Sequence, residues 1–296
     1  MLRGLSAFPL TPITNNNVDE AAFVHLITNL VAAGVDSIGA VGSTGSYAYL
    51  TRDERRRVTE LAVQHAEGIP VLVSIGAIRL DDVLAIAEDA QRAGVKAVMM
   101  APVSYQRLNA EEVYTLYDTV TRHLSVPLCL YDNPATTGFA FTDDLLVEIA
   151  ALPAVCSIKL SAVSTDPTKG KERIDDLRAR IPASVTIGIS GDWQAATGFA
   201  AGCDVWYSVI GGLFPQVSLA LTRAAQAGNH RLAGELSDQL EPLRQLFRIH
   251  RSLRVMAAAA EILGVFGPSC LPFRLRPLTG EDKEHLHAVL KSTGLV

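Results

Sequence analysis

The chain has 296 residues, of which 49% are hydrophobic and 19% are charged, and its formal net charge is −5. This composition predicts a globular protein with a large core, and the lack of a basic block argues against nucleic acid as a partner. No apolar run reaches the ~18–20 residues that span a bilayer, and the N-terminus leads directly into a strand-like segment, so we expect a cytoplasmic protein without a membrane partner.

Three segments of similar sequence organise the chain, at 33–38, 93–98 and 201–206. Each follows an amphipathic stretch, places a glycine where a helix C-cap needs left-handed backbone, and opens a strand. The glycines Gly34, Gly94 and Gly202 are separated by 60 and 108 residues. These separations fit two and four βα units of roughly 27–30 residues each.

The other elements fall where this period requires them. Further strands are predicted at 4–9, 70–74, 127–131, 155–159 and 185–189, and helices at 19–33, 52–66, 80–93, 109–124, 142–150, 170–180, 194–201 and 215–228. Alternating strands and helices predict a (β/α)₈ TIM barrel of the α/β class. The alternative is a doubly wound sheet, which usually has a glycine-rich turn after its first strand, where this chain has Phe8-Pro9-Leu10-Thr11-Pro12.

Beyond Gly228 the pattern is helical, with helices predicted at 231–249, 252–263 and 282–291 and no linker that would release a separate domain. We therefore expect a barrel with the active site in 1–228 and a C-terminal helical extension in 229–296, packed on the barrel. The four cysteines have no C-x-x-C spacing and are expected to be reduced core residues rather than metal ligands or disulfides.

Lys159 ends the short apolar segment 155–159. Burial disfavours an ammonium and lowers the pKa of lysine from about 10.4 toward the ~7–8 of a catalytic amine. A neutral amine in an apolar pocket can form a Schiff base with a ketone. The simpler alternative is a strand-end lysine whose ammonium reaches solvent.

Other candidates follow neighbouring strands, where barrels carry their reactive groups. Gly42-Ser43-Thr44-Gly45 offers backbone N–H groups and two hydroxyls suited to a carboxylate or phosphate, or it is only a tight turn. Tyr131 ends the strand next to that of Lys159, so its phenol can carry protons, or it is an interface aromatic. Gly191, before Asp192, would let substrate approach the backbone, and Tyr207 on the eighth strand is a further substrate-binding candidate.

Together, Gly42-Ser43-Thr44-Gly45, Tyr131-x-x-Pro134-x-x-Thr137-Gly138, Lys159 and Gly191-Asp192 resemble the dihydrodipicolinate synthase / N-acetylneuraminate lyase family over nearly the whole chain. These are pyruvate-dependent class I aldolases and lyases. The resemblance implies that Lys159 is the Schiff-base lysine, that Tyr131 is the general acid/base, and that Ser43, Thr44 and the loop amides up to Gly45 hold the pyruvyl carboxylate. It also implies a hydrogen bond from Thr44 to Tyr131.

Members of that family also borrow a tyrosine from the neighbouring subunit for a proton relay. The candidate here is Tyr105, although a shift of one residue would place Ser104 at that position. The resemblance further implies a homotetramer built as a dimer of dimers. No metal or organic cofactor is expected, because the imine on Lys159 is itself the electron sink, and the partners are pyruvate and an aldehyde.

One position bears on the substrate. Dihydrodipicolinate synthases carry an arginine two residues after the motif proline, where it binds the carboxylate of the semialdehyde acceptor, and this chain has Thr136 there. We therefore predict a lyase for a 2-keto-3-deoxy sugar acid or related 4-hydroxy-2-oxo acid, in which Thr136 binds substrate and Arg107 either contacts its distal end or is solvated. The alternatives are a 4-hydroxy-tetrahydrodipicolinate (dihydrodipicolinate) synthase, a sugar-acid dehydratase, and a non-catalytic small-acid-binding barrel.

Overall fold

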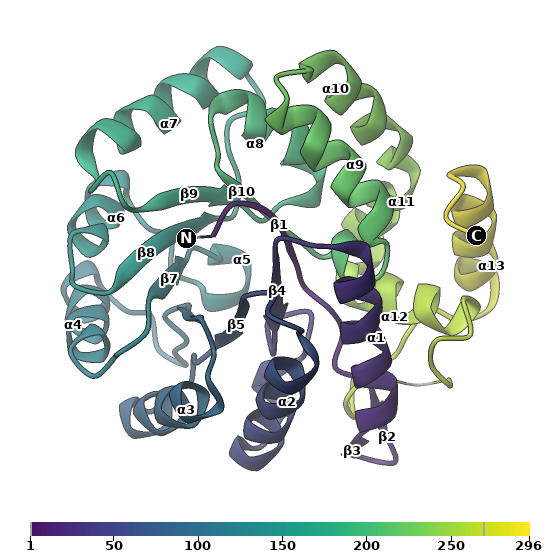
Figure 1. Ribbon diagram of the computed structural model, residues 1–296, viewed down its shortest axis with the longest axis horizontal. Helices are drawn as coiled ribbons and strands as arrows, with labels where there is room; N and C mark the ends of the chain where they lie inside the picture. The colour runs from purple at the N-terminus through teal and green to yellow at the C-terminus, as the bar shows by residue number, and fades with distance from the viewer. Residues whose placement is uncertain (1, 269) are drawn as a thin grey trace.

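The computed structural model describes residues 2–268 and 270–296, and within them eight parallel strands close into a barrel (Figure 1). Each strand pairs with its neighbours in sequence, and β10 pairs back to β1. The strands are β1 (Gly4–Ala7), β4 (Ser37–Ala40), β5 (Val71–Ser74), β6 (Ala97–Met100), β7 (Leu128–Tyr131), β8 (Val155–Leu160), β9 (Thr186–Ile189) and β10 (Val205–Ser208). The predicted TIM barrel is confirmed.

The helices that follow these strands surround the barrel (Figure 1). They are α1 (Glu20–Ala33), α2 (Arg52–His65), α3 (Leu80–Ala93), α4 (Ala110–Thr121), α6 (Asp143–Ala150), α7 (Pro167–Arg180), α8 (Ala195–Ala201) and α9 (Pro215–Gln226). Gly34, Gly94 and Gly202 are left-handed C-caps with φ of 75°, 88° and 105°, which explains the repeated segments of the sequence.

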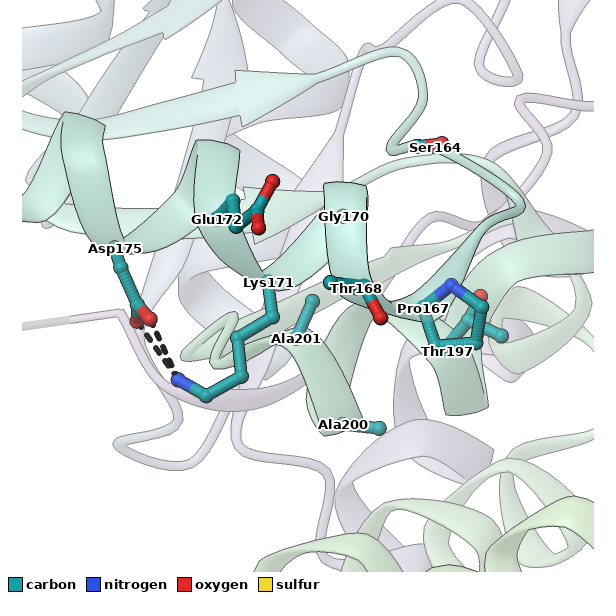
Figure 2. Close-up of a pocket in the computed structure, with 10 residues that line it drawn as sticks. All are labelled: Ser164, Pro167, Thr168, Gly170, Lys171, Glu172, Asp175, Thr197, Ala200 and Ala201. Carbon is teal, nitrogen blue, oxygen red and sulfur yellow. Dashed lines mark hydrogen bonds and ion pairs between the residues drawn. The ribbon is translucent and has the colours of Figure 1, made fainter.

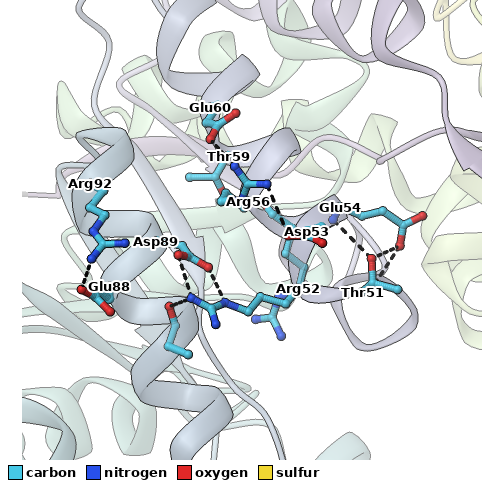
Figure 3. Close-up of polar contacts among 12 residues, drawn as sticks. Thr51, Arg52, Asp53, Glu54, Arg56, Thr59, Glu60, Glu88, Asp89 and Arg92 are labelled. Carbon is cyan, nitrogen blue, oxygen red and sulfur yellow. Dashed lines mark hydrogen bonds and ion pairs between the residues drawn. The ribbon is translucent and has the colours of Figure 1, made fainter.

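Local capping sets where α2 begins and an ion pair ties it to α3 (Figure 3). The Thr51 side chain accepts from the Glu54 backbone N–H, and the Glu54 carboxylate accepts from the Thr51 backbone N–H. Arg52 donates from Nε and Nη2 to the two carboxylate oxygens of Asp89, at 2.6 and 2.9 Å. Because Arg52 is half exposed, solvent screens this bidentate pair and it adds little to the stability of the α2–α3 contact.

The helix predicted over 231–249 is wrong as a single element. The structure has α10 (His230–Gln239) and α11 (Glu241–His250), joined at Leu240. Pro242 lies in the first turn of α11, and it has no N–H to donate back into α10, so the first helix ends before it. The chain continues through α12 (Ser252–Ile262) and α13 (Gly280–Ser292).

The C-terminal helices pack on the barrel of their own chain. Leu10, Leu26, Ile210 and Phe214 from the barrel share one buried apolar cluster with residues of α11, α12 and α13. In Figure 1 these helices lie to one side of the barrel, next to α1 and α9. The α10 helix instead packs on α9 through small alanine side chains.

Two short elements carry no clear signal in the sequence. A hairpin of β2 (Ile13–Thr14) and β3 (Asn17–Val18) turns through Asn15 and Asn16, both at positive φ, which asparagine tolerates better than most residues. The four-residue helix α5 (Pro134–Thr137) follows β7. Within the part of the chain that the structure describes, no helix is both long enough and apolar enough to cross a membrane.

Candidate active site

The strand register brings Lys159 and Tyr131 together. The two residues are direct partners in the β7–β8 pairing, so they lie at the same height in the barrel. The prediction that Lys159 ends its strand is wrong, because the next residue, Leu160, still pairs with Ile189 of β9. The correction moves the strand end by one residue and leaves the lysine near the carboxyl-terminal rim.

The Lys159 amine lies among aromatic rings. Its Nζ is 3.9 Å from the ring centroid of Phe8, 4.0 Å from that of Tyr131 and 5.4 Å from that of Tyr207. Lys159 is only 4% exposed, and within residues 2–268 and 270–296 no carboxylate oxygen lies within ion-pair distance of it. The amine is therefore enclosed mainly by apolar surface.

This enclosure lowers the pKa of the amine. Burial lowers the pKa of Lys159 from 10.5 to about 7, and the charges of Cys129 and Asp192 oppose part of that shift. About half of the molecules would then carry a neutral amine at pH 7. The value agrees with the range that the sequence analysis derived from desolvation, and the solvent-reaching alternative for Lys159 is wrong.

Asp192 is a buried carboxylic acid that affects the pKa of the Lys159 amine. It begins the short 3₁₀ helix η2 (Asp192–Gln194), and its Oδ1 accepts from Trp206 Nε1 at 3.0 Å, Ser208 Oγ at 2.9 Å and the Val209 N–H at 3.2 Å. Burial raises the pKa of Asp192 to about 6, while those hydrogen bonds lower it. The carboxylate is thus ionised and held in place at neutral pH, and it raises the pKa of Lys159.

Tyr131 presents a protonated phenol beside the amine. Burial raises its pKa well above 10, and hydrogen bonding with the Ser43 side chain offsets part of the increase. The expected bond from Thr44 to Tyr131 is absent from the described residues. The loop is sharply folded, with Val41 and Ser46 in the left-handed region at φ of 51° and 56°.

Glycines in the loop after β4 are required by its packing. A Cβ on Gly42 would lie 2.7 Å from the Phe8 ring, and one on Gly45 would lie 3.0 Å from Thr11 Oγ1. Thr44 is buried at the same loop, and the Thr11 hydroxyl has no hydrogen-bond partner among the described residues. The loop therefore packs against Phe8 and Thr11, and its Ser43 side chain reaches the Tyr131 phenol.

Tyr207 contributes its ring rather than its hydroxyl. The side chain is fully buried, and its OH shares a 2.6 Å hydrogen bond with Ser157 Oγ and accepts from Cys129 Sγ at 3.4 Å. Thr186 extends this polar chain by donating to Ser157 Oγ at 2.8 Å. The hydroxyl is thus engaged inside the barrel, while the ring faces Lys159.

Two of the predicted site residues, Tyr105 and Thr136, have exposed side chains, and a third, Gly191, is covered. Tyr105 is 88% exposed in the loop after β6. Thr136 is exposed on α5, where its Oγ1 accepts from Asn133 Nδ2 at 3.0 Å. A Cβ on Gly191 would lie 3.0 Å from the Trp193 ring, so the space next to this glycine is filled by Trp193 rather than open to substrate.

Phe8 is the site residue that the sequence analysis did not identify. Its ring lies against Nζ because Gly39 and Gly42 on the adjacent β4 segment have no side chain; a Cβ on Gly39 would be 2.4 Å from the ring. A glycine in a strand suggests close approach of another group, but not which group approaches. The sequence therefore predicts a close approach at Gly39, but it does not identify Phe8 as the residue that approaches.

Tyr47, in the loop after β4, was not predicted as a site residue either. It is buried, and the Arg55 guanidinium lies 5.2 Å from its ring centroid. Arg55 donates to the backbone oxygens of Ser74 at 2.6 Å and Gly76 at 3.1 Å, so it connects α2 to the end of β5. Burial lowers the pKa of Arg55 to about 10, and the guanidinium remains charged at neutral pH.

A separate surface pocket of about 480 Å³ lies between α7 and α8 and contains none of the predicted site residues (Figure 2). Ser164, Pro167 and Thr197 line it, and its ion pair between Lys171 and Asp175 is exposed. The four cysteines are free and buried, as predicted. Across 2–268 and 270–296, no three His, Cys, Asp or Glu side chains gather as a metal site would require.

A closed (β/α)₈ barrel with a buried, desolvated lysine beside a tyrosine at its carboxyl-terminal rim defines a class I aldolase, a lyase that acts through a Schiff base. Comparison with known proteins agrees: residues 1–293 match the family model described as "Dihydrodipicolinate synthetase family". The chain belongs to this family.

Individual relatives cover the whole chain. A crystal structure of dihydrodipicolinate synthase from Agrobacterium tumefaciens is 42% identical, covers 99% of this chain and 98% of its own, and superposes with a TM-score of 0.94. The 4-hydroxy-tetrahydrodipicolinate synthase of Bartonella bacilliformis is 29% identical over 100% of this chain and 99% of its own length. That of Phenylobacterium zucineum is 31% identical over 88% and 85%.

Proposed function

We propose that Lys159 attacks the C2 carbonyl of pyruvate to form a Schiff base, and that the resulting enamine joins or leaves an aldehyde. The observation that carries the proposal is the buried Lys159 amine, with a pKa of about 7, lying 4.0 Å from the Tyr131 ring centroid. The neutral amine, the ketone and one proton give the protonated imine and one water. The protonated imine then withdraws electrons from C3, which allows its proton or its C3–C4 bond to be lost.

The surrounding residues have separate roles in this proposal. Tyr131 is the general acid/base, because its phenol stays protonated at neutral pH and can donate to the substrate oxygen. Ser43, Thr44 and the amides near Gly45 hold the carboxylate of pyruvate, as short hydroxyl-bearing loops can. Ser43 also contacts the phenol, so it links the carboxylate site to the proton donor.

The names of the relatives favour the alternative over the main sequence-based prediction of a sugar-acid lyase. Several relatives that align over nearly the full chain are named 4-hydroxy-tetrahydrodipicolinate synthase. We therefore propose aspartate semialdehyde as the first candidate for the acceptor and the synthase as the first candidate activity. The mechanism at Lys159 is the same for both activities.

One observation keeps the 2-keto-3-deoxy sugar acid lyase as a second candidate. Thr136 stands where the synthases have an arginine, and its hydroxyl is already bonded to Asn133. The segment 132–138 contains no Lys or Arg that could pair with an acceptor carboxylate. An uncharged threonine lacks the bidentate geometry of a guanidinium.

Two assays on the purified protein test these proposals. Incubation with pyruvate and borohydride should leave a reduced adduct on Lys159, located by peptide mass spectrometry, and Lys159→Ala should leave none. If the wild-type protein forms no adduct, the Schiff-base function is wrong. Consumption of pyruvate with aspartate semialdehyde would support the synthase, whereas pyruvate release from 2-keto-3-deoxy sugar acids without semialdehyde turnover would support the lyase.

We also propose that the active protein is a cytoplasmic homotetramer and needs no metal or organic cofactor. The proposed chemistry places the positive charge on the Lys159 nitrogen, so no further electron sink is required. Activity that survives dialysis against a chelator would support this part of the proposal. Activity restored only by a metal would contradict it.

A further inference from the structure

The protonated imine is a cation, yet the Lys159 nitrogen has no carboxylate within ion-pair distance in the residues that the structure describes. Asp192 acts on it only at longer range, because its Oδ1 is occupied by Trp206, Ser208 and Val209. Three aromatic ring faces lie over Nζ, those of Phe8, Tyr131 and Tyr207. These ring faces are therefore placed to stabilise the cation at short range.

Phe8 and Tyr207 are held in this position by the backbone. Gly39 and Gly42 leave the recess that Phe8 fills, and a Cβ on Gly188 would lie 2.5 Å from the Tyr207 ring. The two rings meet edge to face, with centroids 6.0 Å apart and an angle of 80° between their planes. The Tyr207 hydroxyl is anchored by its hydrogen bond with Ser157, which holds the Tyr207 ring in place.

We propose that Phe8, assisted by Tyr207, is a catalytic residue that stabilises the protonated Lys159 imine through its ring face. The negative face of an aromatic ring attracts a cation within about 6 Å of its centroid, and the attraction is largest where water is excluded. Phe8 at 3.9 Å and Tyr207 at 5.4 Å both meet this criterion, and the amine is almost fully buried. This inference rests on the proposed Schiff-base function.

The rings stabilise the product, so they shift the equilibrium of imine formation rather than the rate at which the amine attacks the ketone. Imine formation consumes the neutral amine, the ketone and one proton, and releases water, so positive charge appears on nitrogen in the product. A ring face that favours this charge lowers the pyruvate concentration at which half of the protein is in the imine form. The same ring faces also favour the ammonium of the free protein, so the effect on imine formation is largest above pH 7, where the free amine is neutral.

The test is the pyruvate concentration for half-maximal borohydride trapping at about pH 9, where the free amine is neutral, measured by intact mass. Phe8→Leu keeps an apolar side chain but removes the ring face, and we expect a rise of about 5- to 30-fold. Phe273→Leu removes an exposed ring of the C-terminal segment and should leave the value unchanged. An unchanged value for Phe8→Leu, with normal trapping by the wild-type protein, would overturn the inference and leave the proposed function intact.

A second variant separates charge stabilisation from shape and covers the case in which Phe8→Leu does not fold. Replacing Phe8 by 3,5-difluorophenylalanine keeps the ring and weakens its negative face. We expect a smaller rise in the half-saturating pyruvate concentration in the same direction. If the fluorinated protein is folded by circular dichroism and traps pyruvate like the wild type, the ring only fills space and the proposal is wrong.

Discussion

Lys159 is buried and has no ion-pair partner among the residues that the structure describes, and both features affect its pKa. We predict that the initial rate of trapping by pyruvate and cyanoborohydride rises with pH through about 7 and then levels off. The reason is that only the neutral amine attacks, and burial has moved its pKa to about 7. A rate that keeps rising toward the ordinary lysine pKa of about 10.4 would show that the amine is solvated.

The lowered pKa of Lys159 also reduces the free energy of unfolding, by an amount that depends on pH. The folded-state pKa of Lys159 lies below the unfolded one, so between about pH 7 and 10.4 the unfolded chain binds more protons and the wild type becomes more stable as pH rises. Lys159→Met removes this penalty. We expect its gain in the free energy of unfolding to be larger at pH 6 than at pH 9, by on the order of 2 kcal/mol.

Urea titrations at the two pH values measure that gain. Lys171→Met, at an exposed lysine on α7, is the matched control and should show little difference between them. An equal gain for Lys159→Met at both pH values would mean that the lysine titrates as it does in water.

At the scale of elements, the contact between β4 and the segment after β1 determines the position of Phe8. We predict that Gly39→Ala destabilises the protein by about 1–3 kcal/mol, because the new methyl would lie 2.4 Å from the Phe8 ring in a tightly packed barrel. In a Phe8→Ala background the same substitution should cost much less, since all three nearest atoms belong to Phe8.

Chemical denaturation of the four proteins in this double-mutant cycle gives the coupling. Gly234→Ala on α10, where nothing lies within 4 Å of the added Cβ, should be neutral or slightly stabilising. Additive effects of the Gly39 and Phe8 substitutions would contradict the packing that places the ring against the amine.

The elements were largely predictable from the sequence because their signals are local. Glycine C-caps mark the ends of α1, α3 and α8, and capping boxes at Thr51 and Asn109 mark helix starts. The break at Leu240 was missed because the amphipathic pattern continues across it, although Pro242 marks it. The hairpin around Asn15 forms few contacts and leaves little periodicity to detect.

The site was predictable only in part. The pairing of Lys159 with Tyr131 on adjacent strands follows from their places at or next to the carboxyl ends of those strands. The role of Phe8 depends on which side chain enters the recess left by Gly39, and the choice of Ser43 over Thr44 depends on the folding of one loop. Both are properties of tertiary packing, which sequence periodicity does not contain.

At the scale of the whole molecule, exposed apolar side chains stand on three consecutive loops of the catalytic rim. Tyr49, Ile78 and Tyr105 follow β4, β5 and β6, which are neighbours in the barrel. We predict that these loops contact a second subunit in the proposed tetramer and that Tyr105→Asp lowers the mass of the assembly. Light scattering after size-exclusion chromatography measures the mass of the assembly. The control is Ile249→Asp, at an exposed residue of α11, which should leave that mass unchanged.

A pyruvate-bound crystal structure tests the central claim most directly. The account predicts continuous electron density from Nζ of Lys159 to C2 of pyruvate, with the carboxylate at Ser43 and Thr44, the Tyr131 hydroxyl near C2, and the Phe8 ring facing the nitrogen. Pyruvate bound elsewhere, or a free amine at full pyruvate occupancy, would contradict it.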